Sequence, residues 1–96
     1  MEQVVLLPGL MCDERLFEPL IKLLKPNYHV HVPIMDTQKS IDGMAKYLLN
    51  TISGPFHLVG LSMGRIIAMT VAIKDPSRVK SMVLMMITLM INIITR

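Results

Sequence analysis

The 96-residue sequence is poor in several kinds of residue, and each shortage excludes a class of structure or partner. Its one cysteine, Cys12, excludes a disulfide within the chain and favours a reducing compartment. Only 18% of the residues are charged, and the scattered lysines and arginines behind the net charge of +3 indicate solubility rather than nucleic-acid binding. The first nine residues, MEQVVLLPG, lack the positive start and the long apolar run of a signal peptide. We therefore expect a cytoplasmic protein that binds no nucleic acid.

Hydrophobic residues make up 52% of the sequence, which excludes a disordered or collagen-like chain, and the length suits one domain. Short apolar or alternating runs predict strands over 4–7, 28–33, 56–60 and 79–85. Helical spacing predicts helices over about 13–24, 41–52 and 63–73. The first of these helices can alternatively begin near Pro19, because proline is tolerated in the first turn of a helix. Ser40 or Asp42 is expected to cap the second helix, while the third, apolar nearly all round, is expected to be buried. The alternation predicts an α/β fold with a mostly parallel sheet of about four strands and flanking helices.

The stretch LVGLSMGR, residues 58–65, places the pattern G-x-S-x-G between the third predicted strand and the third predicted helix. A serine at the tip of a sharp strand-to-helix turn needs small neighbours, and Gly60 and Gly64 remove the clash that side chains would cause there. The helix that follows Ser62 would favour developing negative charge through its free N–H groups and its dipole. The alternative is a structural serine in an ordinary turn, but the strand before it and the helix after it favour a nucleophile.

Acyl transfer at Ser62 would also need two backbone N–H groups to hold the oxyanion. One is expected from Met63, the residue after the nucleophile, and the other from the loop after the first strand. In that loop, LLPGLMCD, Gly9 lets the chain turn an amide inward, so the amides of Leu10 and Met63 are the predicted pair. The alternative is that LLPGLMCD is a plain connection between a strand and a helix.

Together these segments resemble the α/β-hydrolase superfamily, and in particular a bacterial branch of esterase-like serine hydrolases. The stretch VVLLPGLMCDERLFEPL is similar to the oxyanion-loop strand and the next helix of that branch. The stretch FHLVGLSMGRIIAMTVAIKDPSRVKSMVLM is similar to its nucleophile strand, elbow, helix and next strand, and DTQKSIDGMAKYLL to the helix between them. The resemblance covers about residues 3–85 and implies a partial α/β-hydrolase fold.

The resemblance also implies a function and a site. It implies a serine hydrolase of small-molecule carboxylic esters or thioesters, with Ser62 as nucleophile and the amides of Met63 and Leu10 as oxyanion donors. It implies no metal and no organic cofactor. Cys12 falls at a position of the same branch, in a Leu-Leu-Pro-Gly-Leu-x-Cys-Asp stretch, and we interpret it as a packed thiol rather than a nucleophile.

The sequence departs from the family at two places. The elbow usually continues with a second glycine, but here Arg65 follows, a cation in the first helical turn that opposes the dipole and either crowds the next strand or extends to solvent. The triad of this fold places an acid and then a histidine after the serine, but only Asp75 and no histidine follow Ser62. Asp75 is typical of a residue that ends a helix, and His57, five residues before Ser62 on a strand, would lie about 15 Å away. We therefore expect an incomplete triad in this chain.

Residues 86–96, MITLMINIITR, diverge from the family and stay apolar. We interpret residues 1–96 as a single truncated domain, of which 1–85 is family-like, and favour a frameshift or premature stop as the origin of the tail. A true alternative ending and a membrane anchor are the other interpretations, although the apolar run over 82–94 is only about two-thirds of the roughly 20 residues that a span needs. We expect the apolar tail to promote self-association.

Two functions from different classes remain open. The chain is either the N-terminal part of a serine hydrolase or a non-catalytic remnant of the hydrolase fold that binds or assembles. A nucleotide-binding half of a Rossmann fold would share the alternation of strands and helices. It would also need G-x-G-x-x-G after the first strand or a P-loop lysine, and the sequence has neither.

Overall fold

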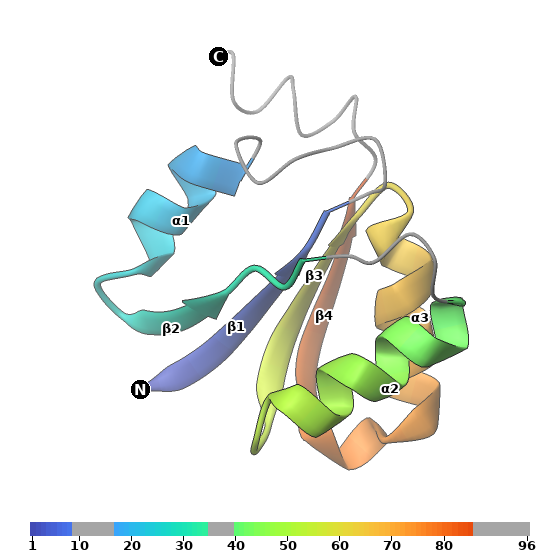
Figure 1. The fold of residues 1–96 in the computed structure, drawn as a ribbon. Coiled ribbons are helices and arrows are strands. Elements are labelled where there is room, and N and C mark those ends of the chain that lie inside the picture. Colours follow the sequence, from blue (N-terminus) through green and yellow to red (C-terminus); the bar gives the residue numbers. More distant parts are fainter. Residues whose placement is uncertain (9–16, 35–39, 86–96) are drawn as a thin grey trace.

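The structure is a computed structural model that describes residues 1–8, 17–34 and 40–85 (Figure 1). In chain order the elements are β1 (Glu2–Leu7), α1 (Glu18–Leu24), β2 (Tyr28–His31), α2 (Ile41–Thr51), β3 (Phe56–Leu61), α3 (Gly64–Lys74), a 3₁₀ turn (Pro76–Arg78) and β4 (Val79–Met85). The predicted alternation of strands and helices is confirmed. Helix α1 begins at Glu18, with Pro19 in its first turn, which matches the later of its two predicted starts. Leu10, Cys12 and the tail 86–96 lie outside the described residues.

The four strands form one parallel sheet in the order β2-β1-β3-β4. The sheet is in register from β1 to β3, with Leu7 beside Gly60 at the carboxyl ends of the two strands. Because parallel strands end at the same edge, the chain leaves both strands on the same side of the molecule. Ser62, which follows β3 directly, therefore lies at the carboxyl edge of the sheet.

Helices cover both faces of the sheet (Figure 1). Helices α2 and α3 pack on one face, and α1 packs on the other. The core beneath α2 and α3 contains Val5, Leu7, Met44, Ala45, Leu48, Ile52, Phe56, Leu58, Ile67, Ala68 and Val71. The core beneath α1 contains Val4, Leu6, Phe17 and Leu61. Alternate residues of β1 enter opposite cores because successive side chains of a strand point to opposite faces.

Helix α2 has the boundaries and the buried face that its spacing predicts. The Ser40 hydroxyl accepts a hydrogen bond from the Gly43 N–H at 3.0 Å, so Ser40, and not Asp42, is the N-cap. Met44 and Leu48 are buried one turn apart, in the same core as Ile52 just beyond the helix. Asp42 instead pairs on the surface with Lys46 at 3.4 Å.

Helix α3 is less buried than its sequence predicts. Gly64, Ile67, Ala68 and Val71 are buried and form one stripe along the helix. The expectation of burial on all sides is wrong, because Ile73 is 81% exposed and Ile66 and Met69 are about two-fifths exposed. Within the described residues, α3 meets the sheet and α2 along that one stripe. The opposite side of the helix is left as apolar surface.

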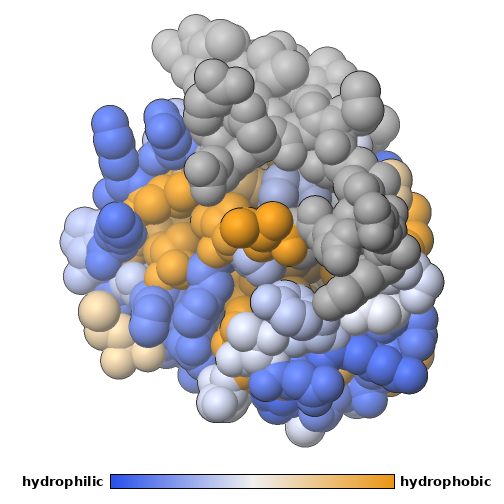
Figure 2. Space-filling model, in the orientation of Figure 1, coloured by the Kyte–Doolittle hydropathy of each residue, from blue (hydrophilic) through white to orange (hydrophobic). Residues whose placement is uncertain are grey.

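Hydrophobic residues also reach the surface elsewhere. Figure 2 shows them gathered near the middle of the face in view, bordered by hydrophilic residues. Among the described residues, Ile34 after β2 and Leu23 on α1 have side chains that are mostly exposed. No helix in the ranges 17–34 and 40–85 is long and apolar enough to cross a membrane.

Arg78, the last residue of the 3₁₀ turn, fixes the carboxyl end of α2. Its Nε donates to the Gly54 carbonyl oxygen at 2.7 Å, and its Nη1 donates to that of Leu49 at 3.3 Å. Its Nη2 donates to the carbonyl oxygen of Ile52, and the guanidinium lies 5.4 Å from the centre of the Phe56 ring. The last carbonyls of a helix lack partners within the helix, and Arg78 supplies a donor to one of them, that of Leu49, and to the carbonyls of Ile52 and Gly54 just beyond α2. Arg78 thereby holds α2 against the start of β3.

Candidate functional site

Ser62 stands in a strained turn between β3 and α3. Its φ is 55°, the only positive φ of a residue other than glycine among those described. Its N–H still donates to the carbonyl oxygen of Met85 at 2.9 Å, so the residue continues the pairing of β3 with β4 before the chain turns into the helix. A left-handed conformation at a residue with a Cβ atom costs about 1–2 kcal/mol. Such strain is typical of functional sites, where the surrounding structure keeps it in place.

The glycines on both sides of Ser62 leave no room for a side chain. A Cβ atom on Gly60 would lie 2.8 Å from the carbonyl oxygen of Gly64 and 2.9 Å from the Cα of Arg65. A Cβ atom on Gly64 would overlap the carbonyl oxygen of Leu7 and lie 2.8 Å from its carbonyl carbon. These neighbours are backbone atoms that cannot rotate away. The two glycines therefore let α3 begin in direct contact with β3 and β1, as the sharp turn requires.

The first turn of α3 brings backbone N–H groups to the same edge of the sheet. The N–H of Arg65 donates to the Ser62 carbonyl oxygen at 3.0 Å, and that of Ile66 donates to the Met63 carbonyl oxygen at 3.1 Å. Within residues 1–8, 17–34 and 40–85, the Met63 N–H has no hydrogen-bond acceptor. An open N–H at a helix N-terminus, with the positive end of the helix dipole behind it, favours a negative ligand. The other predicted donor, Leu10, lies outside the described residues.

The Arg65 side chain makes a contact that the sequence did not predict. It is partly buried, and its Nε donates to the Ser62 carbonyl oxygen at 3.0 Å. The side chain thus bends back over the first turn. Sequence reasoning missed this contact, although the three-residue spacing in a helical turn places the two residues as neighbours.

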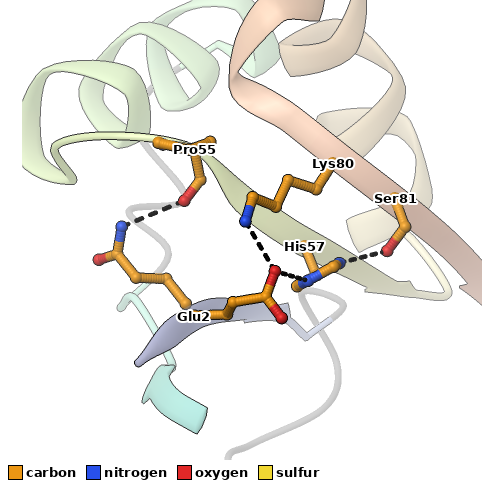
Figure 3. Close-up of polar contacts among 6 residues, drawn as sticks. Glu2, Pro55, His57, Lys80 and Ser81 are labelled. Carbon is orange, nitrogen blue, oxygen red and sulfur yellow. Dashed lines mark hydrogen bonds and ion pairs between the residues drawn. The ribbon is translucent and has the colours of Figure 1, made fainter.

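His57 is held far from Ser62, at the other end of β3. Its Nδ1 is 2.6 Å from the Ser81 hydroxyl, and its Nε2 is 3.3 Å from the Glu2 carboxylate, as Figure 3 shows. Lys80 donates to the same Glu2 oxygen at 2.6 Å. The hydrogen bond from Lys80, followed by that from His57, holds the pKa of Glu2 below its usual range. His57 therefore joins β1, β3 and β4 at their amino ends and is not placed to accept a proton from Ser62.

The other two histidines lie on β2, which β1 separates from β3. The rings of His29 and His31 stack with their centres 4.5 Å apart, and His31 Nε2 is 2.9 Å from the Gln3 side-chain oxygen. Burial, and then the nearby charge of His29, lowers the pKa of His31. Asp75 ends α3 and accepts a hydrogen bond from the Ser77 hydroxyl at 2.6 Å. Neither these histidines nor Asp75 is brought to the Ser62 turn.

The described residues contain no group of three or more His, Cys, Asp or Glu side chains that could hold a metal ion. The residues that the sequence singled out, which are the predicted site, the packed thiol and the histidines excluded as a base, fall into three sets. Gly60, Ser62, Met63 and Gly64 come together in one turn at the carboxyl edge of the sheet. Leu10 and Cys12 fall outside the described residues. The described histidines belong to other contacts.

Comparison with protein-family models gives no match. Among curated proteins, the chain is 32% identical over 89 residues to the pimeloyl-[acyl-carrier protein] methyl ester esterases of Legionella pneumophila strains Corby and Paris. It is 30% identical to the protein of that name from strain Lens. Each alignment covers 83% of this chain and 36% of the relative. The chain thus spans about a third of the length of the curated relatives that it matches.

Two solved structures share the architecture. An extracellular α/β-hydrolase from a Paenibacillus species matches with a TM-score of 0.68 at 21% identity, covering 88% of this chain and 40% of that one. A thermophilic esterase from Thermogutta terrifontis, with malate bound, matches with a TM-score of 0.67 at 22% identity, covering 88% and 36%. At these identities the likeness establishes the fold, and the resemblance to the α/β-hydrolases that the sequence indicated is confirmed. The chain therefore has part of the fold of these α/β-hydrolase structures and is similar in sequence to the curated methyl ester esterases.

Proposed function

We propose that this chain carries the nucleophile and oxyanion donors of a serine hydrolase that acts on carboxylic esters or thioesters. The observation that carries the proposal is the turn at Ser62, with φ of 55° between two glycines that tolerate no Cβ atom. A serine held in this way projects from a strand-to-helix turn at the edge of the sheet. The curated relatives are named for cleaving a methyl ester, which supports an ester as the substrate class.

In the proposed reaction the Ser62 hydroxyl oxygen attacks the carbonyl carbon of the ester and its proton passes to solvent. The carbonyl oxygen becomes an oxyanion, which accepts a hydrogen bond from the Met63 N–H at the N-terminus of α3. Cleavage of the bond to the alcohol or thiol then releases that group and leaves the acyl group on Ser62. Loss of one oxyanion donor typically costs a factor of about 100–1,000 in rate, so its placement matters as much as that of the serine. The Leu10 amide is the proposed second donor, by its place in the loop after β1. We propose no metal and no organic cofactor.

The described residues supply no base for Ser62, because His57 is bound to Ser81 and Glu2 at the opposite end of β3. A serine hydroxyl without a base is a weak nucleophile. We therefore expect this chain by itself to be acylated slowly, and only by strongly activated reagents.

A fluorophosphonate probe tests the proposal. The purified chain should be labelled slowly, and peptide mass spectrometry should place the adduct on Ser62. Ser62→Ala should abolish labelling. Ser81→Ala is the matched control, because Ser81 lies 2.6 Å from a histidine but in a plain strand, and it should leave labelling unchanged. An adduct on Ser81, or labelling that survives Ser62→Ala, would sink the proposal.

A second function, a non-catalytic remnant of the hydrolase fold that binds or assembles, is favoured by one observation. All three histidines of the sequence lie on β2 or near the start of β3, away from Ser62. Turnover of an activated ester by the purified chain separates the two functions. Turnover that disappears in Ser62→Ala refutes the remnant, whereas a chain with neither turnover nor probe labelling supports it. The cytoplasmic location and the self-association through residues 86–96 stay predictions.

A further inference from the structure

The carbonyl oxygen of Ser62 accepts two hydrogen bonds from the same residue. The backbone N–H of Arg65 donates to it at 3.0 Å, and the Nε of the Arg65 side chain donates to it at 3.0 Å. Glycine, the usual residue of the family at this position, could supply only the first of these bonds. The second is charge-assisted, and bonds from an ionised donor are roughly twice as strong as bonds between neutral groups.

This carbonyl belongs to the peptide group that joins Ser62 to Met63. A peptide group is planar and trans, so its C=O and its N–H point in opposite directions along one rigid plate. The N–H of this plate is that of Met63, the proposed oxyanion donor. Any contact that fixes the Ser62 carbonyl oxygen therefore also fixes the direction in which the Met63 N–H points.

The same contact strengthens that N–H as a donor. Hydrogen bonds that share a peptide group polarise one another, by about 10–30% per bond. A cationic donor on the carbonyl oxygen draws electron density away from the peptide nitrogen. The Met63 proton thereby becomes a better donor to a developing negative charge.

We propose that Arg65 is a positioning residue for the oxyanion hole: its Nε holds and polarises the Ser62–Met63 peptide group so that the Met63 N–H faces the reacting carbonyl. The proposal rests on the proposed function of Ser62. It assigns to Arg65 a role that the family pattern, with glycine at this place, does not contain.

Three substitutions of Arg65 separate the donor from the charge. Arg65→Gln puts an uncharged N–H donor at the same number of bonds from the backbone as Nε. Arg65→Met keeps the length but puts a methyl carbon there. Arg65→Lys keeps the charge but puts a carbon there, and its ammonium lies one bond further out. The matched charge control is Lys22→Gln on α1, in a different part of the surface.

The first measurement is the rate at which the fluorophosphonate probe labels Ser62 at saturating concentration, together with the probe concentration at half-maximal rate. Arg65→Met should lower the maximal rate by roughly 2- to 10-fold and leave the half-saturating concentration unchanged. Arg65→Gln, which keeps a donor but loses the charge, should be labelled faster than Arg65→Met and more slowly than the unsubstituted chain. If the probe labels Arg65→Gln and Arg65→Met equally slowly but labels Arg65→Lys as fast as the unsubstituted chain, the charge alone acts and the proposal is wrong. If all three match the unsubstituted chain, Arg65 has no positioning role.

The second measurement does not depend on reactivity. The NMR shift and the hydrogen exchange of the Met63 N–H should change most in Arg65→Met, less in Arg65→Gln, and not in Lys22→Gln. If the unsubstituted chain is never labelled, the proposed function fails, while these signals still decide whether Arg65 holds the peptide group. If Arg65→Met does not fold, Arg65→Lys takes its place as the variant without a donor at the ε position. A Met63 signal identical in every variant overturns the proposal.

Discussion

A Cβ atom on Gly64 would lie 2.8 Å from the carbonyl carbon of Leu7, so α3 starts in direct backbone contact with β1. The Ser62 turn depends on this contact, because the helix that begins two residues after the serine can approach the sheet only where it has no side chain. Gly64→Ala should therefore lower the free energy of unfolding by about 1–3 kcal/mol, the usual cost of forcing an extra group into a packed site. Urea unfolding measures the change.

The control for Gly64→Ala lies on the same helix. Ile73 is 81% exposed, so Ile73→Ala should change the free energy of unfolding by about 0.5 kcal/mol or less. Equal unfolding midpoints for Gly64→Ala and the unsubstituted chain would show that the helix can shift away from β1 at no cost.

The variant Ser62→Gly should be more stable than the variant Ser62→Ala. Its φ of 55° costs about 1–2 kcal/mol for any residue with a Cβ atom, and glycine escapes that cost while losing about 0.5–1 kcal/mol of chain entropy. The free energy of unfolding should therefore be about 0.5–1 kcal/mol higher for Ser62→Gly than for Ser62→Ala. Both variants lack the hydroxyl, so urea unfolding of the pair isolates the backbone.

Ser81 supplies the opposite comparison. It lies within β4, where glycine weakens a strand, so Ser81→Gly should be less stable than Ser81→Ala. If the alanine variant is more stable than the glycine variant at Ser62 as well as at Ser81, Ser62 carries no backbone strain.

Arg78 should stabilise the carboxyl end of α2. Arg78→Met leaves the carbonyl oxygens of Leu49, Ile52 and Gly54 without their donor and should destabilise the protein by about 1–3 kcal/mol in urea unfolding. Arg78→Lys should recover little of this, because one ammonium cannot reproduce the planar fork of donors. Lys22→Met, which removes a surface cation from α1, should cost about 0.5 kcal/mol or less. A full recovery by lysine would contradict the capping role.

The pH dependence of stability should show the environment of His31. Its folded-state pKa lies below the ordinary value of 6.5, so between the two values the unfolded chain binds more protons than the folded one. The contribution of His31 is therefore fully present above pH 6.5 and is lost as the pH falls through the lowered pKa. Urea midpoints compared on either side of this window should fall toward acid, and less so in His31→Gln. An identical fall in that variant would assign the effect to other groups.

The sequence determined the order of the elements and the place of the turn. Period-two and apolar runs marked the strands, and helical spacing marked α2, with Ser40 or Asp42 as its cap; the structure decided for Ser40. The two elbow glycines were readable for the same reason, since the need for a missing side chain is written directly in the residue type. These features depend on neighbours in sequence.

Only the tertiary structure decided which distant groups meet. The strand order β2-β1-β3-β4 separates His29 and His31 from the Ser62 turn, and the register of β1, β3 and β4 places Glu2 and Ser81 around His57. The one-sided burial of α3 and the reach of Arg78 to α2 likewise follow from packing between elements. Arg65 belongs to both groups. Its spacing from Ser62 is local, but only the folded turn shows that its Nε donates to the Ser62 carbonyl oxygen. Sequence fixes what each residue can donate or accept, and the fold fixes which partner lies within reach.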